Sequence, residues 1–319
     1  MQVWHGLAEI DPRLGRTVVT VGNFDGVHRG HRHVISRARE LAAQHGALPV
    51  VAVSFDPHPM KVIAPSHAPQ ALTSLERRMH LLADAGVDVA LVLPFTPELA
   101  KLPAADFVTQ ILLDALQAQG IVVGENFRYG HGARGDVALL EQLCAARGVD
   151  VVSLTLDGCG EQRWSSTFVR SCVVAGDVES AARALGRPYS VQGVVVRGEQ
   201  RGRELGYPTA NVPVAGTQTA VPADGVYAGW LRRLDVEPAP WWPAAISVGT
   251  NPTFDGLDRR VESYVLDRDD LELYDVRVEV AFVARLRGMV KFDGVDALVA
   301  QMRADVDRAR ALLTSAPQD

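Results

Sequence analysis

The chain has 319 residues, of which 47% are hydrophobic, and a formal net charge of −6 at pH 7. This length is enough to bury a large core and to form about two domains. The sequence contains no block of five like charges and no apolar run near the roughly 18 residues of a membrane span, which disfavours nucleic-acid binding and membrane insertion. Because it also has no signal-peptide pattern and its three cysteines are widely spaced, we expect a cytoplasmic protein without a disulfide framework or zinc site.

Short apolar runs rich in β-branched residues predict buried strands in the first half of the chain, at residues 18–21, 49–55, 87–95, 120–124 and 149–154. Helical patterns separate these runs. One of them opens with the capping-box pattern of Thr73 and Glu76, and the next covers residues 104–120. Strands that alternate with helices predict an α/β fold with a parallel sheet, in which ligands bind at the carboxyl ends of the strands.

The turn after the first predicted strand reads GNFDGVHRGH. Its glycines, Gly22, Gly26 and Gly30, allow a ligand to approach the backbone, and the helix that follows directs free N–H groups to the same place. We therefore expect an anion there. His28 and His31 can donate hydrogen bonds to phosphate oxygens and compensate charge during displacement at phosphorus. The alternative is a tight turn with solvated or capping histidines.

Two later segments also follow predicted strands. GENFRYGHGARGD combines Asn126 and Arg128 with two aromatic residues, Phe127 and Tyr129. An aromatic ring can stack on a planar base, and the arginine can hold a phosphate. The segment WSSTFVR supplies hydroxyl groups and an arginine at the start of a helical pattern: Ser165, Ser166, Thr167 and Arg170. A polar loop and the hydroxyl caps of a helix are the alternatives for these two segments.

The pattern changes near residue 186 to short alternating runs separated by turn residues, which predicts an antiparallel barrel or sandwich. We therefore predict domains at residues 1–186 and 187–319. The last segment, DGVDALVAQMRADVDRARALL, has one apolar helical face and predicts a C-terminal helix that packs against the barrel.

Within the predicted β region, GEQRGRELGYPTANV joins a glycine-rich loop to the start of a strand. The loop can follow phosphates, while Thr209 and Asn211 offer the hard oxygen ligands that suit Mg²⁺. The residues expected to contact a nucleotide are Gly202, Arg203, Gly206, Pro208, Thr209 and Asn211. The alternative is a turn that contains a proline and binds no ligand. Farther along, Glu262 shares a strand face with Tyr264, so it is either a base in a polar cleft or an exposed strand glutamate.

In their order and spacing, GNFDGVHRGH, GENFRYG and SSTFVR resemble the adenylyltransferase module of the bacterial bifunctional riboflavin kinase/FMN adenylyltransferase family. That module is a Rossmann-like HxGH nucleotidyltransferase. The resemblance implies that His28 and His31 bind ATP phosphates during adenylyl transfer, and that Asn126, Phe127 and Arg128 lie on the flavin side. It also implies an ATP site lined by Gly22, Asn23, Phe24, Asp25, Gly30, Ser165, Ser166, Thr167 and Arg170.

The PTAN strand and the segment around Glu262 resemble the riboflavin kinase module of the same family. The resemblance implies that Thr209 and Asn211 bind the Mg²⁺–ATP complex. It also implies that Glu262 is the base for the terminal hydroxyl of the flavin, since a hydroxyl gains from a positioned base. The FMN phosphate is already anionic at neutral pH, so the first module requires no such base.

The resulting prediction is an enzyme with two modules. The C-terminal barrel phosphorylates riboflavin to FMN, and the N-terminal domain adenylylates FMN to FAD and pyrophosphate. The expected ligands are riboflavin, FMN, FAD, ATP and Mg²⁺, without nucleic acid or membrane, in a monomer or transient homo-oligomer.

Two alternatives stay open: a chain in which one module only binds flavin, and a non-catalytic flavin or nucleotide sensor that acts on RNA. A class I aminoacyl-tRNA synthetase is disfavoured. It would pair HxGH with a lysine-rich KMSKS-type loop, whereas this chain has only three lysines, Lys61, Lys101 and Lys291.

Overall fold

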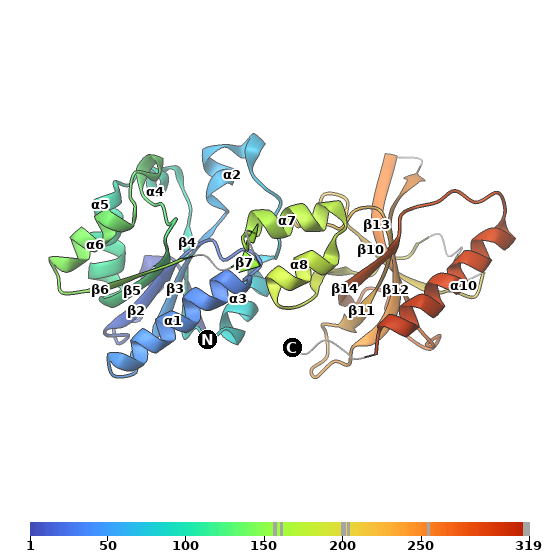
Figure 1. The fold of residues 1–319 in the computed structure, drawn as a ribbon, viewed down its shortest axis with the longest axis horizontal. Helices are drawn as coiled ribbons and strands as arrows, with labels where there is room; N and C mark the ends of the chain where they lie inside the picture. The colour runs from blue at the N-terminus through green and yellow to red at the C-terminus, as the bar shows by residue number, and fades with distance from the viewer. Residues whose placement is uncertain (156–157, 160–161, 199–201, 203–204, 254–255, 315–319) are drawn as a thin grey trace. The chain divides into compact units, whose positions relative to one another are not determined.

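The computed structural model describes residues 1–155, 158–159, 162–198, 202, 205–253 and 256–314. Contacts between residues divide the chain into two compact units, Met1–Ser166 and Thr167–Asp319 (Figure 1). Each unit contains a six-stranded sheet, and the two sheets differ in kind. The first is parallel and the second is antiparallel, as the sequence patterns predicted.

The first unit is built on a parallel sheet with the strand order β1-β4-β3-β2-β5-β6. Its strands are β1 (Gln2–His5), β2 (Thr17–Val21), β3 (Val50–Asp56), β4 (Val89–Pro94), β5 (Ala118–Gly124) and β6 (Asp150–Leu154). The five predicted strands are confirmed. The additional strand β1 pairs with β4 at the edge of the sheet, where four residues give too short a pattern to be recognised from the sequence.

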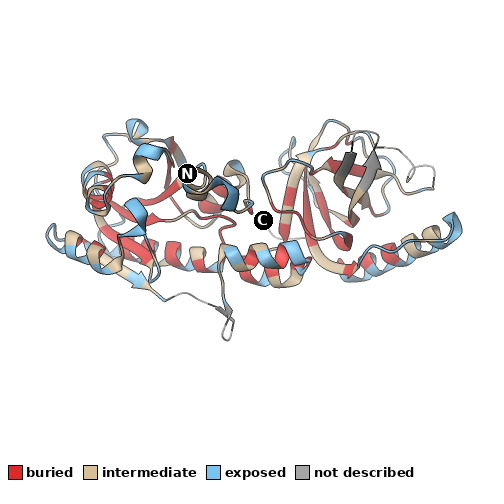
Figure 2. Ribbon diagram, turned by 90° about the horizontal axis from the view of Figure 1, so that it is seen from above, coloured by how far each residue is buried: buried red, intermediate tan, exposed pale blue. Residues whose placement is uncertain are grey.

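Helices cover both faces of this sheet, as predicted. They are α1 (Arg29–Gln44), α2 (Pro59–Ile63), α3 (Leu75–Asp84), α4 (Pro97–Ala100), α5 (Ala104–Asp106), α6 (Val137–Ala145), the 3-10 turns η1 (Leu7–Glu9), η2 (Pro65–His67) and η4 (His131–Ala133), and the π-helix η3 (Phe107–Ala115). Neighbouring strand residues point to opposite faces. Val51 therefore packs with η3 and α6, whereas Ala52 packs with α1 and α3, and buried residues concentrate on the strands (Figure 2).

The predicted capping box at Thr73 is wrong by one residue. Helix α3 begins after Ser74, whose hydroxyl accepts a hydrogen bond from the backbone N–H of Arg77 at 3.2 Å. The N–H and hydroxyl of Thr73 instead donate to the buried carboxylate of Asp25. Both Thr73 and Ser74 are suitable caps, and a carboxylate distant in the sequence decides between them.

The strand order places β2 between β3 and β5. The chain passes from β2 to β3 on one side and later returns to β5 on the other, so the order reverses at β2. In open parallel sheets this reversal marks the edge where ligands bind, at the carboxyl ends of the strands. The loop GNFDGVHRGH follows β2 at this point.

The second unit is an antiparallel sheet with the strand order β10-β13-β12-β11-β14-β9. The strands are β9 (Tyr189–Val194), β10 (Thr209–Pro213), β11 (Gly225–Arg233), β12 (Trp242–Thr253), β13 (Gly256–Val265) and β14 (Arg277–Arg287). The helices are α7 (Ser166–Ala175), α8 (Val178–Leu185) and α10 (Val295–Leu312). A hairpin of β7 (Gly158–Cys159) and β8 (Gln162–Arg163) precedes them in the chain. The N–H of Val196, just after β9, donates to the carbonyl of Asn211 in β10 at 2.8 Å. This bridge joins the two ends of the sheet and curls it into the predicted barrel.

Hydrogen bonds connect α7 and α8 to the barrel. The guanidinium of Arg285, on β14, donates to the carbonyl of Ala175 at the end of α7, and the N–H of Arg285 donates to the carboxylate of Glu179 on α8. The division between the two units therefore falls at the start of α7, between Ser166 and Thr167. The boundary at residue 186, where the sequence pattern changes, stays a prediction.

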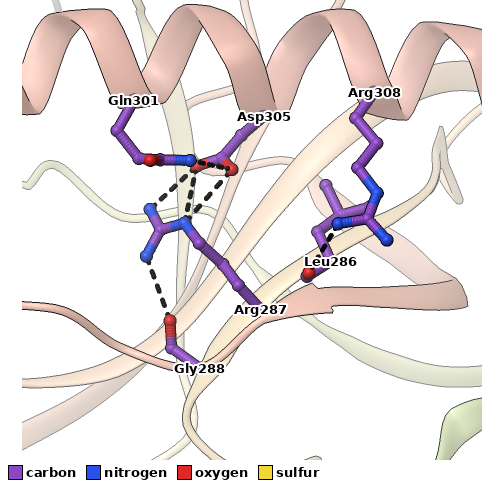
Figure 3. Close-up of polar contacts among 6 residues, drawn as sticks. All are labelled: Leu286, Arg287, Gly288, Gln301, Asp305 and Arg308. Atoms are coloured by element: carbon purple, nitrogen blue, oxygen red, sulfur yellow. Dashed lines mark hydrogen bonds and ion pairs between the residues drawn. The ribbon is translucent and has the colours of Figure 1, made fainter.

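The predicted C-terminal helix, α10, packs against the barrel through an ion pair (Figure 3). Arg287 on β14 donates to both carboxylate oxygens of Asp305, at distances of 2.8 to 3.1 Å. Gln301 donates to the same carboxylate at 2.9 Å, and Arg308 donates to the carbonyl of Leu286 at 3.0 Å. Because Asp305 is buried, this ion pair is shielded from solvent and fixes the helix to β14.

Candidate active sites

The loop between β2 and α1 adopts a backbone conformation that its own side chains maintain. Phe24 and Val27 have φ values of 49° and 40°, in the left-handed region that side chains other than glycine rarely adopt. Both side chains are buried in the core between the sheet and helices α1 and α3. Core packing therefore holds a strained loop in one shape, which is common where a backbone must be positioned for function.

The two histidines of this loop are stacked on each other. Nδ1 of His28 caps α1 by accepting a long hydrogen bond, 3.4 Å, from the N–H of His31, and the ring centroids lie 3.7 Å apart. Since Nδ1 accepts, neutral His28 carries its proton on Nε2. Gly30 leaves room for this arrangement, because a Cβ there would lie only 3.2 Å from the ring of His28.

His31 is held in its neutral form. Burial of the ring is the main cause of a pKa well below the usual value of 6.5. The charge of His28, in its protonated form, and the charge of Arg78 lower this pKa further. An uncharged imidazole near pH 7 acts through a directed N–H group rather than through a full charge. Its Nδ1 is buried and has no hydrogen-bond partner among the described residues.

Asn23 and Asp25 connect the loop to neighbouring segments. The carboxylate of Asp25 accepts hydrogen bonds from the N–H groups of Leu72 and Thr73 at 2.8 to 3.2 Å, ahead of α3. The side-chain amide of Asn23 lies 3.2 Å from Nε2 of His58. Nδ1 of His58 in turn accepts a hydrogen bond from the N–H of Met60 at 3.1 Å. The structure thus gives Asp25 an anchoring role in the loop.

The first part of WSSTFVR lies against the same loop. The hydroxyl of Ser166 donates to the carbonyl of Asp25 at 2.8 Å. The guanidinium of Arg29 lies 5.2 Å from the ring centroid of Trp164. Ser165 is half-buried next to them in the chain. Thr167 and Arg170 belong to the second unit, so their contact with ATP stays a prediction.

The predicted flavin-side segment separates into a buried and an exposed part. Phe127 stacks on Tyr129 at 5.1 Å, and Tyr129 is buried against Gly135, where a Cβ would lie 2.6 Å from its ring. Asn126 and Arg128 are exposed. Burial raises the pKa of the Tyr129 phenol to about 12, and its hydroxyl has no partner among the described residues. Tyr129 is therefore a core residue.

The PTAN strand, β10, places its two predicted ligands beside each other. The amide nitrogen of Asn211 donates to the hydroxyl and to the carbonyl of Thr209, both at 3.1 Å. Gly198 approaches so closely that a Cβ there would lie 2.8 Å from the amide oxygen of Asn211. Glu262 on β13 is the direct partner of Asn211 across the sheet, and Tyr264 is the partner of Thr209. Directly opposed residues share a face, so the sheet brings Glu262 next to the PTAN pair.

A pocket adjoins this strand. It is lined by Val195, Gly198, Pro208, Thr209, Ala210, Asn211, Ser263, Val265, Arg268, Asp269, Leu271, Glu272, Leu273 and Tyr274. Of these residues, Pro208, Thr209 and Asn211 were predicted from the sequence. Residues 268–274 were not, because this segment after β13 carries no recognisable pattern. Glu262 is not part of the lining. Gly202 and Gly206 are described in the loop before β10, whereas Arg203 lies outside the described residues.

The oxygen atoms at the PTAN strand suit a magnesium ion that arrives with a nucleotide. Thr209 and Asn211 provide a hydroxyl and an amide oxygen, and the described residues contain no cluster of three or more histidine, cysteine or acidic side chains. Mg²⁺ commonly binds one or two protein oxygens and completes its shell with phosphates and water. Two neutral oxygens therefore fit a Mg²⁺–ATP complex better than a free ion.

Two features define the class of this protein. A parallel sheet carries an HxGH loop at its strand ends, and an antiparallel barrel carries a PTAN strand opposite a glutamate, so the chain is a nucleotide-dependent transferase with two modules. The FAD synthetase family model matches residues 11–168, and the riboflavin kinase model matches residues 185–313. The chain belongs to the bifunctional riboflavin kinase/FMN adenylyltransferase family.

Relatives support this assignment over nearly the whole chain. The bifunctional riboflavin kinase/FMN adenylyltransferase of Escherichia coli K12 is 36% identical, with 96% of this chain and 95% of the relative covered. The enzyme of the same name from Pseudomonas fluorescens is 38% identical, with 98% of each covered. The chain is therefore a kinase and a nucleotidyltransferase of flavin biosynthesis.

A solved structure from Streptococcus pneumoniae, described as a macrolide-efflux protein, has the same fold. It is 31% identical, with a TM-score of 0.87, and covers 97% of this chain and 99% of its own. In the part of our chain that the structure describes, no helix has the length and apolar character needed to cross a membrane.

Proposed function

We propose that the stacked histidines bind the phosphates of ATP while FMN is adenylylated. A phosphate oxygen of FMN attacks the α-phosphorus of ATP, the bond from that phosphorus to the bridging oxygen breaks, and pyrophosphate leaves. The attacking group is already an anion, so the work of the site is positioning and charge compensation. Nε2–H of His28 and the neutral ring of His31 are suited to donate hydrogen bonds to the phosphate oxygens.

The main support for this proposal is the position of His28 and His31 at the start of α1. His28 caps the N-terminus of α1, where free backbone N–H groups and the helix dipole favour an anion. We assign the lining of the ATP site to the loop residues Gly22, Asn23, Phe24, Asp25 and Gly30, with the hydroxyl groups of Ser165 and Ser166 beside them. Asn126, Phe127 and Arg128 form the proposed flavin side, and the expected contact of Thr167 and Arg170 with ATP stays a prediction.

We propose that Glu262 is the base of the kinase reaction. The terminal ribityl hydroxyl of riboflavin gives its proton to Glu262, its oxygen bonds to the γ-phosphorus of ATP, and the bond from that phosphorus to ADP breaks. The register that pairs Glu262 with Asn211 supports this role, since it sets the carboxylate beside the PTAN residues. Thr209 and Asn211 would hold Mg²⁺, which neutralises phosphate charge when it is bound with ATP.

The two activities follow each other, because the product of the barrel is the substrate of the first domain. Riboflavin, FMN, FAD and ATP are accordingly the ligands we assign, in the cytoplasm and without nucleic acid. The test is a time course with riboflavin, ATP and Mg²⁺ in which riboflavin, FMN and FAD are separated. We expect FMN first and FAD after a lag. FMN without FAD would show that the HxGH domain only binds its ligand, and the absence of any product would refute both assignments.

A further inference from the structure

A buried cation near the histidine pair has no part in the roles assigned above. Arg78, on α3, is 5% exposed, and its Nη1 donates to the hydroxyl of Ser54 at 3.4 Å and to the carbonyl of Phe55 at 3.3 Å. Its Nε is buried without a hydrogen-bond partner among the described residues. No carboxylate in the described ranges forms an ion pair with Arg78. Arginine is almost never fully buried unless it is paired, so this residue needs an explanation.

The contacts of Arg78 reach the histidine loop through Ser54. The hydroxyl of Ser54 is fully buried and donates to the carbonyl of Asn23 at 3.3 Å. A hydroxyl has one proton, so Ser54 accepts from Arg78 and donates to the loop. Asn23 in turn pairs with His58, in the segment after β3. Arg78 therefore links the ends of β2 and β3.

The charge of Arg78 acts on the same loop. Burial lowers the pKa of the guanidinium, while the charges of Asp25 and Asp56 raise it. The carboxylate of Asp25 is already held by backbone N–H groups ahead of α3. The positive charge of Arg78 is consequently only partly compensated, and it adds to the positive N-terminal end of α1. Such a potential favours a bound polyanion and becomes stronger where water is excluded.

We propose that Arg78 is a positioning residue for adenylyl transfer. Through Ser54 it fixes the loop that carries His28 and His31, and its charge increases the positive potential where the triphosphate binds. This inference rests on the proposed role of the two histidines. It assigns Arg78 no contact with the reacting atoms.

The test compares three variants of the full chain, Arg78→Met, Arg78→Lys and Ser54→Ala, for FAD formation from FMN and ATP. We expect Arg78→Met to lower kcat about 100-fold, a loss on the scale of a removed electrostatic contact. Arg78→Lys keeps the positive charge but loses the planar guanidinium group. Its kcat should be within about tenfold of the wild-type value. Ser54→Ala should lower kcat about fivefold to tenfold, the cost of one hydrogen bond.

Two internal controls accompany these variants. The same proteins should form FMN from riboflavin within about twofold of the wild-type rate, because that reaction belongs to the barrel. Arg37→Met removes a guanidinium on α1 whose partner is Glu40 at the surface, a pair that contributes little, and should leave both activities unchanged.

Wild-type kcat for FAD formation in Arg78→Met would overturn the inference. A second pattern would also overturn it. In that pattern Arg78→Lys has no higher kcat than Arg78→Met, and FMN formation, FAD formation and the thermal midpoint all fall in both variants. This result would indicate a purely structural role for Arg78. If Arg78→Met does not fold, the other two variants decide: wild-type kcat in both overturns the proposal, and a selective loss of FAD formation supports it. His28→Ala, measured in parallel, tests the histidine assignment separately.

Discussion

The two proposed active sites differ, at the scale of single residues, in the charge they present to the attacking group. The adenylyltransferase loop holds His31 neutral through burial and neighbouring positive charge, and it receives a phosphate that needs no base. The barrel places the carboxylate of Glu262 opposite Asn211, and it receives a hydroxyl that must lose a proton. The side-chain chemistry of each site therefore matches the acidity of its expected nucleophile.

This difference makes the two activities separable by point mutation. We expect His28→Ala to reduce FAD formation from FMN by about 100-fold to 1,000-fold, because a phosphate hydrogen bond is lost, and to leave FMN formation unchanged. Glu262→Ala should reduce FMN formation by about 100-fold or more and leave FAD formation from FMN unchanged. Both activities are measured on each purified variant. Loss of both in either variant, with the fold intact by circular dichroism, would contradict two independent sites.

Tyr129 offers a stability prediction, because its hydroxyl is buried without a partner among the described residues. Tyr129→Phe removes this group and should stabilise the first unit by about 1 kcal/mol, the cost of an unsatisfied polar group. The matched control is Tyr189→Phe, where the lost hydroxyl donates to the carbonyl of Ala220 at 2.6 Å. The control should destabilise its unit by a similar amount. Thermal unfolding distinguishes the two, and a lower midpoint for Tyr129→Phe would refute the argument.

Among the elements of the second unit, α10 is fixed to the barrel by the ion pair of Arg287 and Asp305 (Figure 3). The neighbouring helix residues Val306 and Ala309 are buried against the sheet, which excludes water from the pair. A shielded pair costs more to break than a surface pair, because the remaining charge is left without a partner. The helix is therefore an integral part of the barrel.

Breaking this pair should destabilise the second unit. We expect Asp305→Ala to lower the free energy of unfolding by about 2 kcal/mol, less than for a fully buried pair because Arg287 is 20% exposed. Asp307→Ala, on the same helix, removes an exposed partner of Arg310 and should change stability by less than about 0.5 kcal/mol. Chemical denaturation followed by circular dichroism measures both. Equal effects would contradict the shielding argument.

Element types were predicted more reliably than element boundaries. The helical pattern over residues 104–120 contains α5 and the π-helix η3, but its last residues already belong to β5, which begins at Ala118. The sequence in this region is apolar throughout, so periodicity does not show where a buried helix ends and a buried strand begins. Pairing of Ala118 with Thr17 in β2 determines the start of the strand.

For the whole molecule, the two units contribute separate sites to consecutive reactions. The histidine pair comes from the first unit and the PTAN strand with Glu262 from the second. FMN formed in one chain should therefore be usable by another. An equimolar mixture of His28→Ala and Glu262→Ala chains is expected to convert riboflavin to FAD, whereas neither variant does so alone. If the mixture stops at FMN, the flavin must pass between sites within one chain.

The sequence was enough to predict the two fold classes and the motifs, because strand periodicity, glycine spacing and the residue types of GNFDGVHRGH and PTAN are local properties of the chain. It also indicated His28, His31 and Glu262. The folded structure was needed to show which residues surround them, since Arg78, Ser54 and the pocket segment 268–274 carry no local pattern. It also showed that Asp25 anchors a loop and that Tyr129 is a core residue. These roles depend on contacts between segments distant in the sequence, and such contacts form only when the sheet brings its strand ends together.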